Sequence, residues 1–437
     1  MFPPTLIVLL SGFAIRHYIA GSWVADWLAD RNEISTPLTS WKRVTEGLAL
    51  YKNGISPYDG DIFHEMPLVL RFLNFLNTFG SNRLSLIFTI CDLLTAIMLE
   101  RTAKHFAGLL LKRQATSVKN YSVDSKTLLL KATDVNSIRL YVMAAYLLNP
   151  YSVSVCVAKS TGVFLNLIMA FLLYFTITGN KNKAYIFLAF ATYKSLYPIM
   201  LVVPIALHLA HVELKSTNLS RDQVVSAILR ASLTTLTIVL GLLYISFTLE
   251  GSWKFLHSTF GFILGAPDLE PNMGVFWYFF TEMFEHFRVF FICVFQINAF
   301  IYTVPLAFKL KDDPIFLMYS LIALTAIFKS YPSLSDVAFY LSLLPIWRHV
   351  FGYMRNNLFV AGMLIVSTVL APMLWHLWIF AGSANSNFYF SISLVFSTAQ
   401  IFLITDLIFA YLRREYDLLN GVDQKDEDGK PVQVLLD

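Results

Sequence analysis

The sequence predicts an all-α polytopic membrane protein whose chain crosses the bilayer in about ten to twelve transmembrane helices. Of its 437 residues, 56% are hydrophobic and only 14% are charged, and the mean hydropathy is +0.60. Apolar runs follow one another along almost the whole chain, and each crossing needs about 20 such residues. We therefore interpret residues 1–437 as a single transmembrane domain.

Apolar runs that are long enough to span, or nearly so, set the number of helices. They cover residues 2–22, 84–99, 138–158, 161–178, 184–210, 228–249, 253–265, 274–308, 315–347, 357–380 and 388–412. The runs 184–210, 274–308 and 315–347 each contain a break, so each counts as one or two helices. The first run lacks a basic N-terminal region, and its first basic residue is Arg16. It is interpreted as a retained helix rather than a signal peptide.

The charges of the loops predict the orientation of the chain. Loop 101–139 carries eight Lys/Arg against two Asp/Glu, whereas loop 26–83 carries six Lys/Arg against seven Asp/Glu. Basic loops stay in the cytosol, so loop 101–139 is predicted to be cytoplasmic and loop 26–83 to lie on the opposite side of the membrane. Arg413 and Arg414 follow the last apolar run, which predicts a cytoplasmic tail over 413–437. The N-terminus is predicted to be cytoplasmic as well.

An amide-rich turn joins the last two apolar runs and is the first candidate site. This amide junction, residues 382–387, contains two Asn and two Ser, where a plain hairpin would need only a turn. The candidate ligand-binding residues in and beside it are Asn385, Asn387, Trp375, His376 and Trp378. Asn side chains both donate and accept hydrogen bonds. Because the junction lies one span before the cytoplasmic tail, it is predicted to bind a polar ligand on the non-cytoplasmic side.

The second candidate site is an aromatic segment followed by a polar stripe. The aromatic segment is Phe276, Trp277, Tyr278, Phe279 and Phe280, and the polar stripe is Glu282, Glu285, His286 and Arg288. On one continuous helix, Glu282, Glu285 and His286 would share a face, so a carboxylate–histidine metal site is one interpretation. Charges at this depth are costly, and pairing within the stripe, with another subunit or with a lipid headgroup is preferred. The aromatic side chains suit acyl chains or an interfacial belt.

Asp59 and Asp61 have the spacing of a metal-binding Asp-x-Asp motif, which membrane-embedded glycosyltransferases use in a lumenal loop. The preceding Pro57 and the intervening Gly60 are instead typical of a turn. We favour the turn and predict no metal site.

Two weaker patterns leave alternatives open. Lys-Ser followed by Pro occurs inside the apolar runs at 194–198 and at 329–332. Broken helices at matching places in two halves are typical of transporters, although Lys beside a break also reaches the interface by extending its side chain. Lys215 and Arg221 follow a span end and either contact lipid phosphate or serve as ordinary positive-inside anchors.

The sequence also excludes several classes of function. Cys91, Cys156 and Cys293 lie in apolar runs, which predicts neither a disulfide framework nor a nucleophile. There is no Ser/His/Asp set, no phosphate-binding Gly loop and no basic patch for nucleic acid. We therefore expect no catalytic residues, no cofactor and no nucleic-acid partner.

Several longer stretches resemble one known family. They are residues 36–44, 54–58, 63–68, 148–151, 158–161, 274–288, 328–332, 375–378 and 387–388. Together these stretches are similar to the PIG-U family of GPI transamidase subunits, and the resemblance covers nearly the whole chain.

The resemblance implies a multi-pass protein of the endoplasmic reticulum membrane with a fold like that of the membrane-embedded (GT-C-like) glycosyltransferases. It implies a non-catalytic subunit that binds the GPI lipid beside a caspase-like cysteine protease subunit, other GPI transamidase subunits and membrane lipids. It places the 274–288 region at the acyl chains of GPI, and Asn385 and Asn387 near the GPI itself. The shared pattern of the family does not include Asp59 and Asp61. The alternatives are a lipid-linked mannosyltransferase and a lipid transporter.

Overall fold

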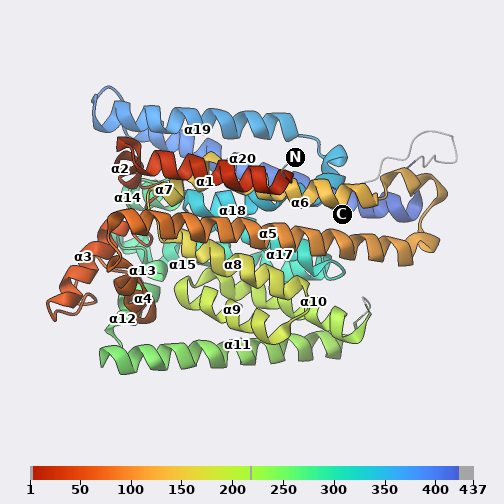
Figure 1. Cartoon of the computed structure of the whole chain (residues 1–437), viewed down its shortest axis with the longest axis horizontal. Coiled ribbons are helices and arrows are strands. Elements are labelled where there is room, and N and C mark those ends of the chain that lie inside the picture. The colour runs from red at the N-terminus through yellow and green to blue at the C-terminus, as the bar shows by residue number, and fades with distance from the viewer. Residues whose placement is uncertain (1–2, 217–218, 423–437) are drawn as a thin grey trace. The chain divides into compact units, whose positions relative to one another are not determined.

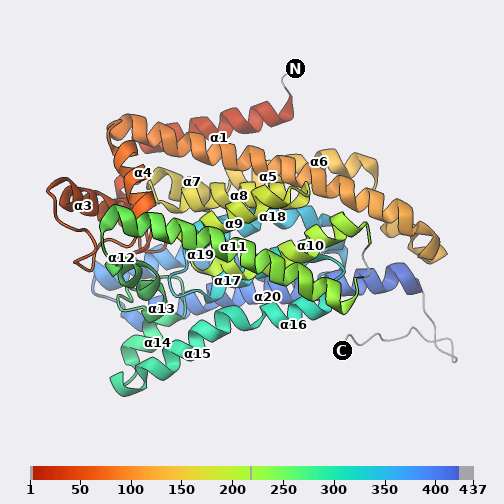
Figure 2. The ribbon, with the colours of Figure 1, turned by 90° about the horizontal axis from the view of Figure 1, so that it is seen from below.

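The computed structural model describes residues 3–216 and 219–422, and this part of the chain contains helices and turns but no strand (Figures 1 and 2). It divides into two compact units. The first unit takes the chain up to Leu99 and from Met143 to Ser342. The second takes Glu100–Val142 and the chain from Leu343 onward.

The helices of the first unit include many short pieces. In chain order they are α1 (Pro4–Ala20), α2 (Trp23–Ala29), α3 (Trp41–Lys52), α4 (Pro67–Asn77), the first half of α5 (Ser81–Ser117), the end of α6 (Ala132–Leu147), α7 (Pro150–Val157), α8 (Gly162–Ile177), α9 (Lys181–Lys194), η3 (Tyr197–Leu201), α10 (Val202–Leu214), α11 (Arg221–Glu250), α12 (Lys254–Leu256), η4 (His257–Gly261), α13 (Phe262–Gly265), α14 (Phe276–Glu282), η5 (Glu285–Phe287), α15 (Arg288–Ile301), α16 (Thr303–Lys309), α17 (Pro314–Phe328) and α18 (Leu334–Leu343). The second unit adds η1 (Val118–Asn120), η2 (Val123–Leu128), η6 (Leu344–Tyr353), α19 (Asn357–Ile379) and α20 (Ser386–Asn420).

Several of these helices are long and apolar enough to cross a membrane, which confirms the prediction of a helical multi-pass protein. Among the described residues, five helical segments meet this criterion of length and composition. The number rises to seven if α1 with α2, bent by 87°, and α6 with α7, bent by 46°, each count as one span. α8 and α17 are apolar but shorter. The 253–265 run forms the short pieces α12, η4 and α13, so it does not make a span by itself.

The three breaks predicted inside long apolar runs are confirmed. α9 ends at Lys194 before η3, α14 ends at Glu282, and α17 ends at Phe328. Proline explains two of these ends, because Pro198 and Pro332 lack the backbone N–H that a continuing helix would need. The breaks bring polar backbone and side chains into otherwise apolar bundles.

A buried ion pair holds α1 within the first unit. Arg16 is fully buried, and its Nε donates to Asp92 Oδ2 of α5 at 2.6 Å. The same guanidinium donates to Leu147 O at 2.7 Å and to Ser152 Oγ at 3.0 Å. Tyr146 OH donates to the other carboxylate oxygen of Asp92 at 2.7 Å. A buried charge is tolerated only when it is paired and hydrogen-bonded, and this network explains the basic residue inside the first apolar run.

In the second unit, α19 packs along the 35-residue α20. The carboxylate of Asp406 in α20 accepts hydrogen bonds from the backbone N–H groups of Arg355 and Asn356, at 3.0 and 2.9 Å. These bonds satisfy the N–H groups of the two residues just before α19, which have no partner within the helix. Much of the segment predicted as the basic loop is helical, since α5 continues to Ser117.

Candidate functional site

The amide junction is a compact, hydrogen-bonded turn between α19 and α20. Gly382 adopts a left-handed conformation with φ of 63°, which favours glycine because a side chain would crowd the backbone there. The backbone N–H groups of Ser383 and Ala384 both donate to Leu377 O, at 3.0 and 3.3 Å. Asn385 is the N-cap of α20, and its Oδ1 accepts from Asn387 N at 3.1 Å. The position of Asn385 is therefore fixed by its own helix.

Two of the predicted aromatic residues meet at this junction. The Trp375 and Trp378 rings lie edge to face with centroids 5.7 Å apart, and Tyr389 packs against them at 5.1 and 6.2 Å. Tyr389 is fully buried, whereas both Trp residues are half-buried and keep part of their surface accessible. His376 points elsewhere, stacking on Phe380 at 5.4 Å. Tyr389 was not among the predicted site residues, although its place in the first turn of α20, next to the amide junction, is evident from the sequence.

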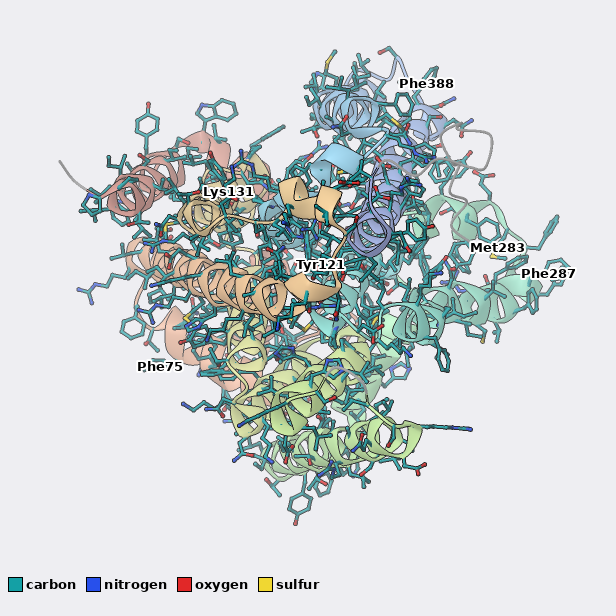
Figure 3. All side chains as sticks on the ribbon, turned by 90° about the vertical axis from the view of Figure 1, so that its right-hand side faces the viewer. Phe75, Tyr121, Lys131, Met283, Phe287 and Phe388 are labelled. Atoms are coloured by element: carbon teal, nitrogen blue, oxygen red, sulfur yellow. The ribbon has the colours of Figure 1, made fainter. Side chains whose placement is uncertain are left out.

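The amide groups of the junction remain accessible. Asn385 and Asn387 are both exposed, and so is Phe388, which Figure 3 places at the edge of the second unit. Within the described residues, Asn385 uses Oδ1 for the cap, and Nδ2 makes no hydrogen bond. An exposed amide donor thus lies beside a packed aromatic cluster at the N-terminus of a long helix.

In the first unit, the aromatic segment is largely a packed core. Phe276, Trp277 and Phe280 are buried, and Phe295 of α15 contacts the rings of Phe276 and Phe280 at 4.9 and 5.3 Å. Phe279 is half-buried and also lies 5.0 Å from the Phe295 ring. Tyr278 is half-buried as well. Only the Tyr278 and Phe279 faces of the segment are therefore accessible to a lipid in this conformation.

The polar stripe does not form one helix face, so that interpretation was wrong. α14 ends at Glu282, and Met283 is extended with ψ of 156° before the short η5 begins at Glu285. Figure 3 shows Met283 and Phe287 at the outer edge of the first unit. The physical reason is that the chain turns at the extended Met283 and the rings of α14 pack against Phe295 of the following helix, so Glu282 and Glu285 lie on different elements.

The members of the polar stripe differ in their surroundings. Glu282, Glu285 and His286 are exposed. Arg288 is half-buried, donates to Ala266 O at 2.8 Å and lies over the Phe280 ring at 5.7 Å. In the part of the chain that the structure covers, no group of three or more His, Cys, Asp or Glu side chains could hold a metal ion.

The predicted turn at Asp59 is confirmed. Asp59 N donates to Ser56 O at 3.4 Å, and the Asp59 carboxylate forms an exposed ion pair with Lys254 at 2.7 Å. Asp61 is exposed. Lys215 is also exposed and ends α10 in a left-handed conformation.

The two Lys-Ser breaks meet in a buried polar centre of the first unit. Lys194 Nζ donates to both carboxylate oxygens of Glu65 at 2.7 Å, and Thr161 Oγ1 donates to the same carboxylate at 2.6 Å. Tyr197 OH accepts from Ser330 N at 3.0 Å, which joins the first break directly to the second. Sequence reasoning noticed both lysines but missed Glu65, which lies in a distant loop.

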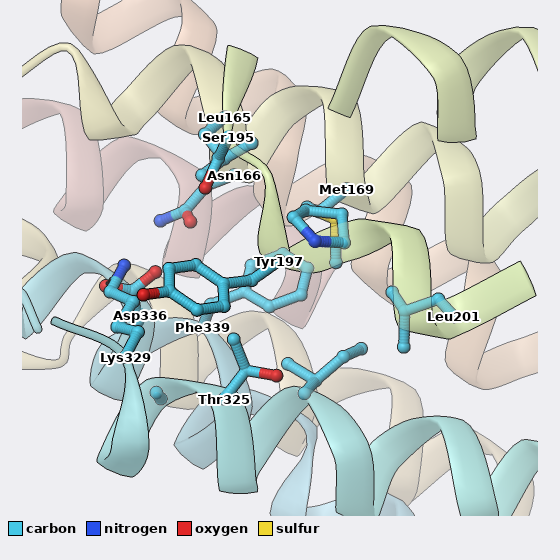
Figure 4. Close-up of a pocket in the computed structure, with 13 residues that line it drawn as sticks. Leu165, Asn166, Met169, Ser195, Tyr197, Leu201, Thr325, Lys329, Asp336 and Phe339 are labelled. Atoms are coloured by element: carbon cyan, nitrogen blue, oxygen red, sulfur yellow. Dashed lines mark ion pairs between the residues drawn. The ribbon is translucent and has the colours of Figure 1, made fainter. Parts of the chain in front are cut away.

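A pocket of about 490 Å³ opens beside this centre (Figure 4). Lys329 and Asp336 form an ion pair at one end, and Leu201 lies at the other. Asn166 and Ser195 add polar groups to the wall. Each lysine of the two breaks is paired with a carboxylate, so the centre carries little net charge and the surrounding bundle tolerates it.

Comparison of the sequence with known proteins identifies the family of this chain. The family described as "GPI transamidase subunit PIG-U" matches residues 10–396, a range that includes both candidate sites. The chain belongs to the PIG-U family. The human "GPI-anchor transamidase component PIGU" is 43% identical over 438 residues and covers 100% of both chains. The "GPI transamidase component GAB1" of Saccharomyces cerevisiae is 33% identical over 394 residues, 89% of each chain.

A more distant likeness extends beyond the PIG-U family. The "GPI mannosyltransferase 1" of Dictyostelium discoideum is 29% identical over 161 residues, which is 36% of this chain and 30% of that protein. The family resemblance expected from the sequence motifs is thus confirmed for PIG-U over nearly the full length.

Proposed function

We propose that this chain is a non-catalytic subunit of the GPI transamidase that binds the GPI lipid and presents it to a separate cysteine protease subunit. Membership of the PIG-U family supports the role in the complex. The observation that carries lipid binding is the amide junction, where the exposed Asn385 amide lies beside the Trp375–Trp378–Tyr389 cluster. The remaining subunits of the transamidase are the implied partners.

The chemistry of the junction suits a phosphate-bearing glycolipid. Asn385 Nδ2 can donate to a phosphate oxygen or a sugar hydroxyl while Oδ1 keeps its cap. The N-terminus of α20 contributes a partial positive charge, which favours an anionic group. Trp residues are favoured at the membrane interface, where the headgroup of GPI would lie. Asn387 is exposed beside Asn385, whereas the exposed His376 stacks on Phe380 and is assigned only a peripheral contact.

The acyl chains of GPI are assigned to the aromatic segment. The accessible faces of Tyr278 and Phe279 would contact the chains, and the buried Phe276, Trp277 and Phe280 hold those faces in place. Glu282, Glu285, His286 and Arg288 then form a polar mouth or an assembly surface. Lys215 is assigned a weak contact with lipid phosphate.

The topology completes the proposal. We assign ten to twelve spans, a single GT-C-like membrane domain over 1–437 and location in the endoplasmic reticulum membrane. Loop 26–83 is lumenal, and loop 101–139, the tail 413–437 and the N-terminus are cytoplasmic; residues 423–437 of the tail lie outside the described residues. The apolar helices α8 and α17 support the larger number of spans. The partial match to a GPI mannosyltransferase supports the GT-C-like fold.

Replacing Asn385 by Lys in the assembled complex tests the proposal. The larger, charged side chain removes both the cap and the Asn385 amide, so that GPI co-purifying with the complex and surface GPI-anchored protein should both fall. Asn357→Lys is the matched control, since Asn357 also lies exposed at the start of a helix, at the other end of α19. Normal GPI retention in a fully assembled Asn385→Lys complex would remove the site.

The same preparations separate the alternatives. Mannose transfer from dolichol-phosphate-mannose by the isolated chain, dependent on Asp59 or Asp61, would indicate a mannosyltransferase. Movement of GPI between the leaflets of liposomes that contain the purified chain would indicate a transporter. Neither result is expected from a subunit that only binds and presents its lipid.

A further inference from the structure

A pocket of about 590 Å³ lies among α9, α10 and α11 in the first unit. These three helices run side by side in both ribbon views (Figures 1 and 2). The rim of the pocket carries Lys181, Glu213 and Arg230, and its floor includes Ala206, Ala210 and Ala227. The assigned GPI-binding residues do not line this pocket.

The charge balance of the rim favours an anion. Lys181 and Glu213 approach to 3.5 Å, but both side chains are more than half exposed, so their attraction is weak in water. Arg230 has no carboxylate partner in the described part of the chain, and Nε donates only to Ser226 O at 3.3 Å. The guanidinium therefore keeps N–H groups for a ligand. Its planar geometry is well suited to phosphate oxygens.

The position of Arg230 along α11 matches the depth of lipid phosphate. α11 has 30 residues and is thus about 45 Å long, compared with about 30 Å for the hydrocarbon core of a bilayer. Residues 231–249 contain no charged side chain and span roughly 28 Å at about 1.5 Å per residue. Arg230 is the last charge before this run. It therefore lies at the boundary between headgroups and hydrocarbon.

The floor of the pocket distinguishes a lipid from a free anion. Ala206, Ala210 and Ala227 line the pocket, where their small side chains leave room between the helices. An inorganic phosphate would gain nothing from these methyl groups, whereas the glycerol and upper acyl carbons of a phospholipid would pack on them.

We propose that this pocket binds the phosphate of an anionic phospholipid, held by Arg230 and Lys181 with its glycerol region on the alanine floor. The loop charges assign this end of α9, α10 and α11 to the cytosol, whose membrane leaflet is rich in anionic lipids. The site thereby anchors the three-helix group to that leaflet, independently of GPI on the opposite side.

The test uses the purified complex in phosphatidylcholine vesicles with and without phosphatidylserine, and counts the retained phosphatidylserine by native mass spectrometry. Losing a charge-assisted hydrogen bond in Arg230→Gln should lower retention by about tenfold. Ala210→Leu fills the floor without changing any charge and should also lower retention. Lys112→Gln is the matched control, because Lys112 is an exposed cation of the basic segment and lies outside the pocket.

Three outcomes would overturn the proposal. Unchanged retention in Arg230→Gln would remove the phosphate contact. Arg230 is exposed, so this variant is expected to fold even if Ala210→Leu does not assemble. Displacement of phosphatidylserine by inorganic phosphate alone would indicate a simple anion site. Equal loss in Lys112→Gln would indicate general surface attraction. Retention of GPI is measured in the same spectra and should stay normal, which separates this site from the amide junction.

Discussion

Asn385 combines two roles that substitution can separate. Its Oδ1 caps α20 by accepting from Asn387 N at 3.1 Å, whereas Nδ2 is the exposed donor assigned to GPI. Asn385→Asp keeps an oxygen acceptor for the cap, but it replaces the donor with a negative charge that faces the lipid phosphate. Asn385→Ala removes both the cap and the donor. The two variants should therefore differ in stability while both lose the ligand.

The expected magnitudes follow from these contacts. Loss of an N-cap side chain in Asn385→Ala costs about 0.5–2 kcal/mol of stability. Asp is as good a cap as Asn, and its charge gains about 0.3–1 kcal/mol from the helix dipole, so Asn385→Asp should be as stable as the wild type or slightly more stable. A hydrogen bond to a charged group contributes about 1.5–3 kcal/mol, which corresponds to a loss of GPI retention of about tenfold to a hundredfold.

The assay measures two quantities on the same assembled complex. Thermal unfolding reports the cap, and mass spectrometry of co-purified lipid reports GPI per complex. Asn357→Asp provides the control, because it places the same charge at the start of α19. The reasoning is refuted if Asn385→Asp retains GPI at the wild-type level. It is also refuted if GPI retention simply follows unfolding temperature across the series.

Three further predictions concern the first unit. The Phe280 ring is buried, so Phe280→Ala should destabilise the complex by about 3–5 kcal/mol. Phe279 is only half-buried, so Phe279→Ala should mainly lower GPI retention. Thermal unfolding and counts of co-purified lipid distinguish the two effects. Joint replacement of Asp59 and Asp61 by Asn keeps the turn and removes an exposed ion pair worth about 0–1 kcal/mol. The amount of surface GPI-anchored protein should therefore stay near normal. A loss that added Mn²⁺ restores would contradict this prediction. Burial lowers the pKa of His64 in loop 26–83 to about 4, so between pH 4 and about 6.5 the folded chain binds fewer protons than the unfolded chain. The free energy of unfolding should therefore fall by about 3 kcal/mol as the pH drops from about 6.5 to 4. In unfolding measurements, His64→Phe should remove this contribution to the pH dependence.

Local chemistry explains why much of the fold could be predicted from the sequence. An apolar run of sufficient length favours a helix whose backbone polar groups are all satisfied within it, as in α19. Pro198 and Pro332 end helices because each lacks a backbone donor. The turn at Asp59 and the amide junction depend on residues next to one another in the chain. The candidate positions Asn385 and Trp375 were visible for the same reason.

The polar stripe shows where local reasoning failed. The spacing of Glu282 and Glu285 fits one helix face, but the helix ends at Glu282. Its preceding aromatic rings pack against Phe295 of another helix, and the chain turns away after them. A periodic pattern predicts a shared face only while the helix continues, and here the chain turns after Glu282 so that α14 packs against the following helix, α15.

Sequence alone thus determined the helical class of the fold, the breaks at Pro198 and Pro332, the family and the candidate residues of the amide junction. Tertiary structure alone decided which distant groups meet: Asp92 beside Arg16, Glu65 beside Lys194, and Arg230 above the alanine floor. A buried or half-buried charge requires a partner, but nothing in its neighbouring residues specifies which one. The partner is selected by how the helices pack, because only packing fixes the few ångströms over which a hydrogen bond or an ion pair acts.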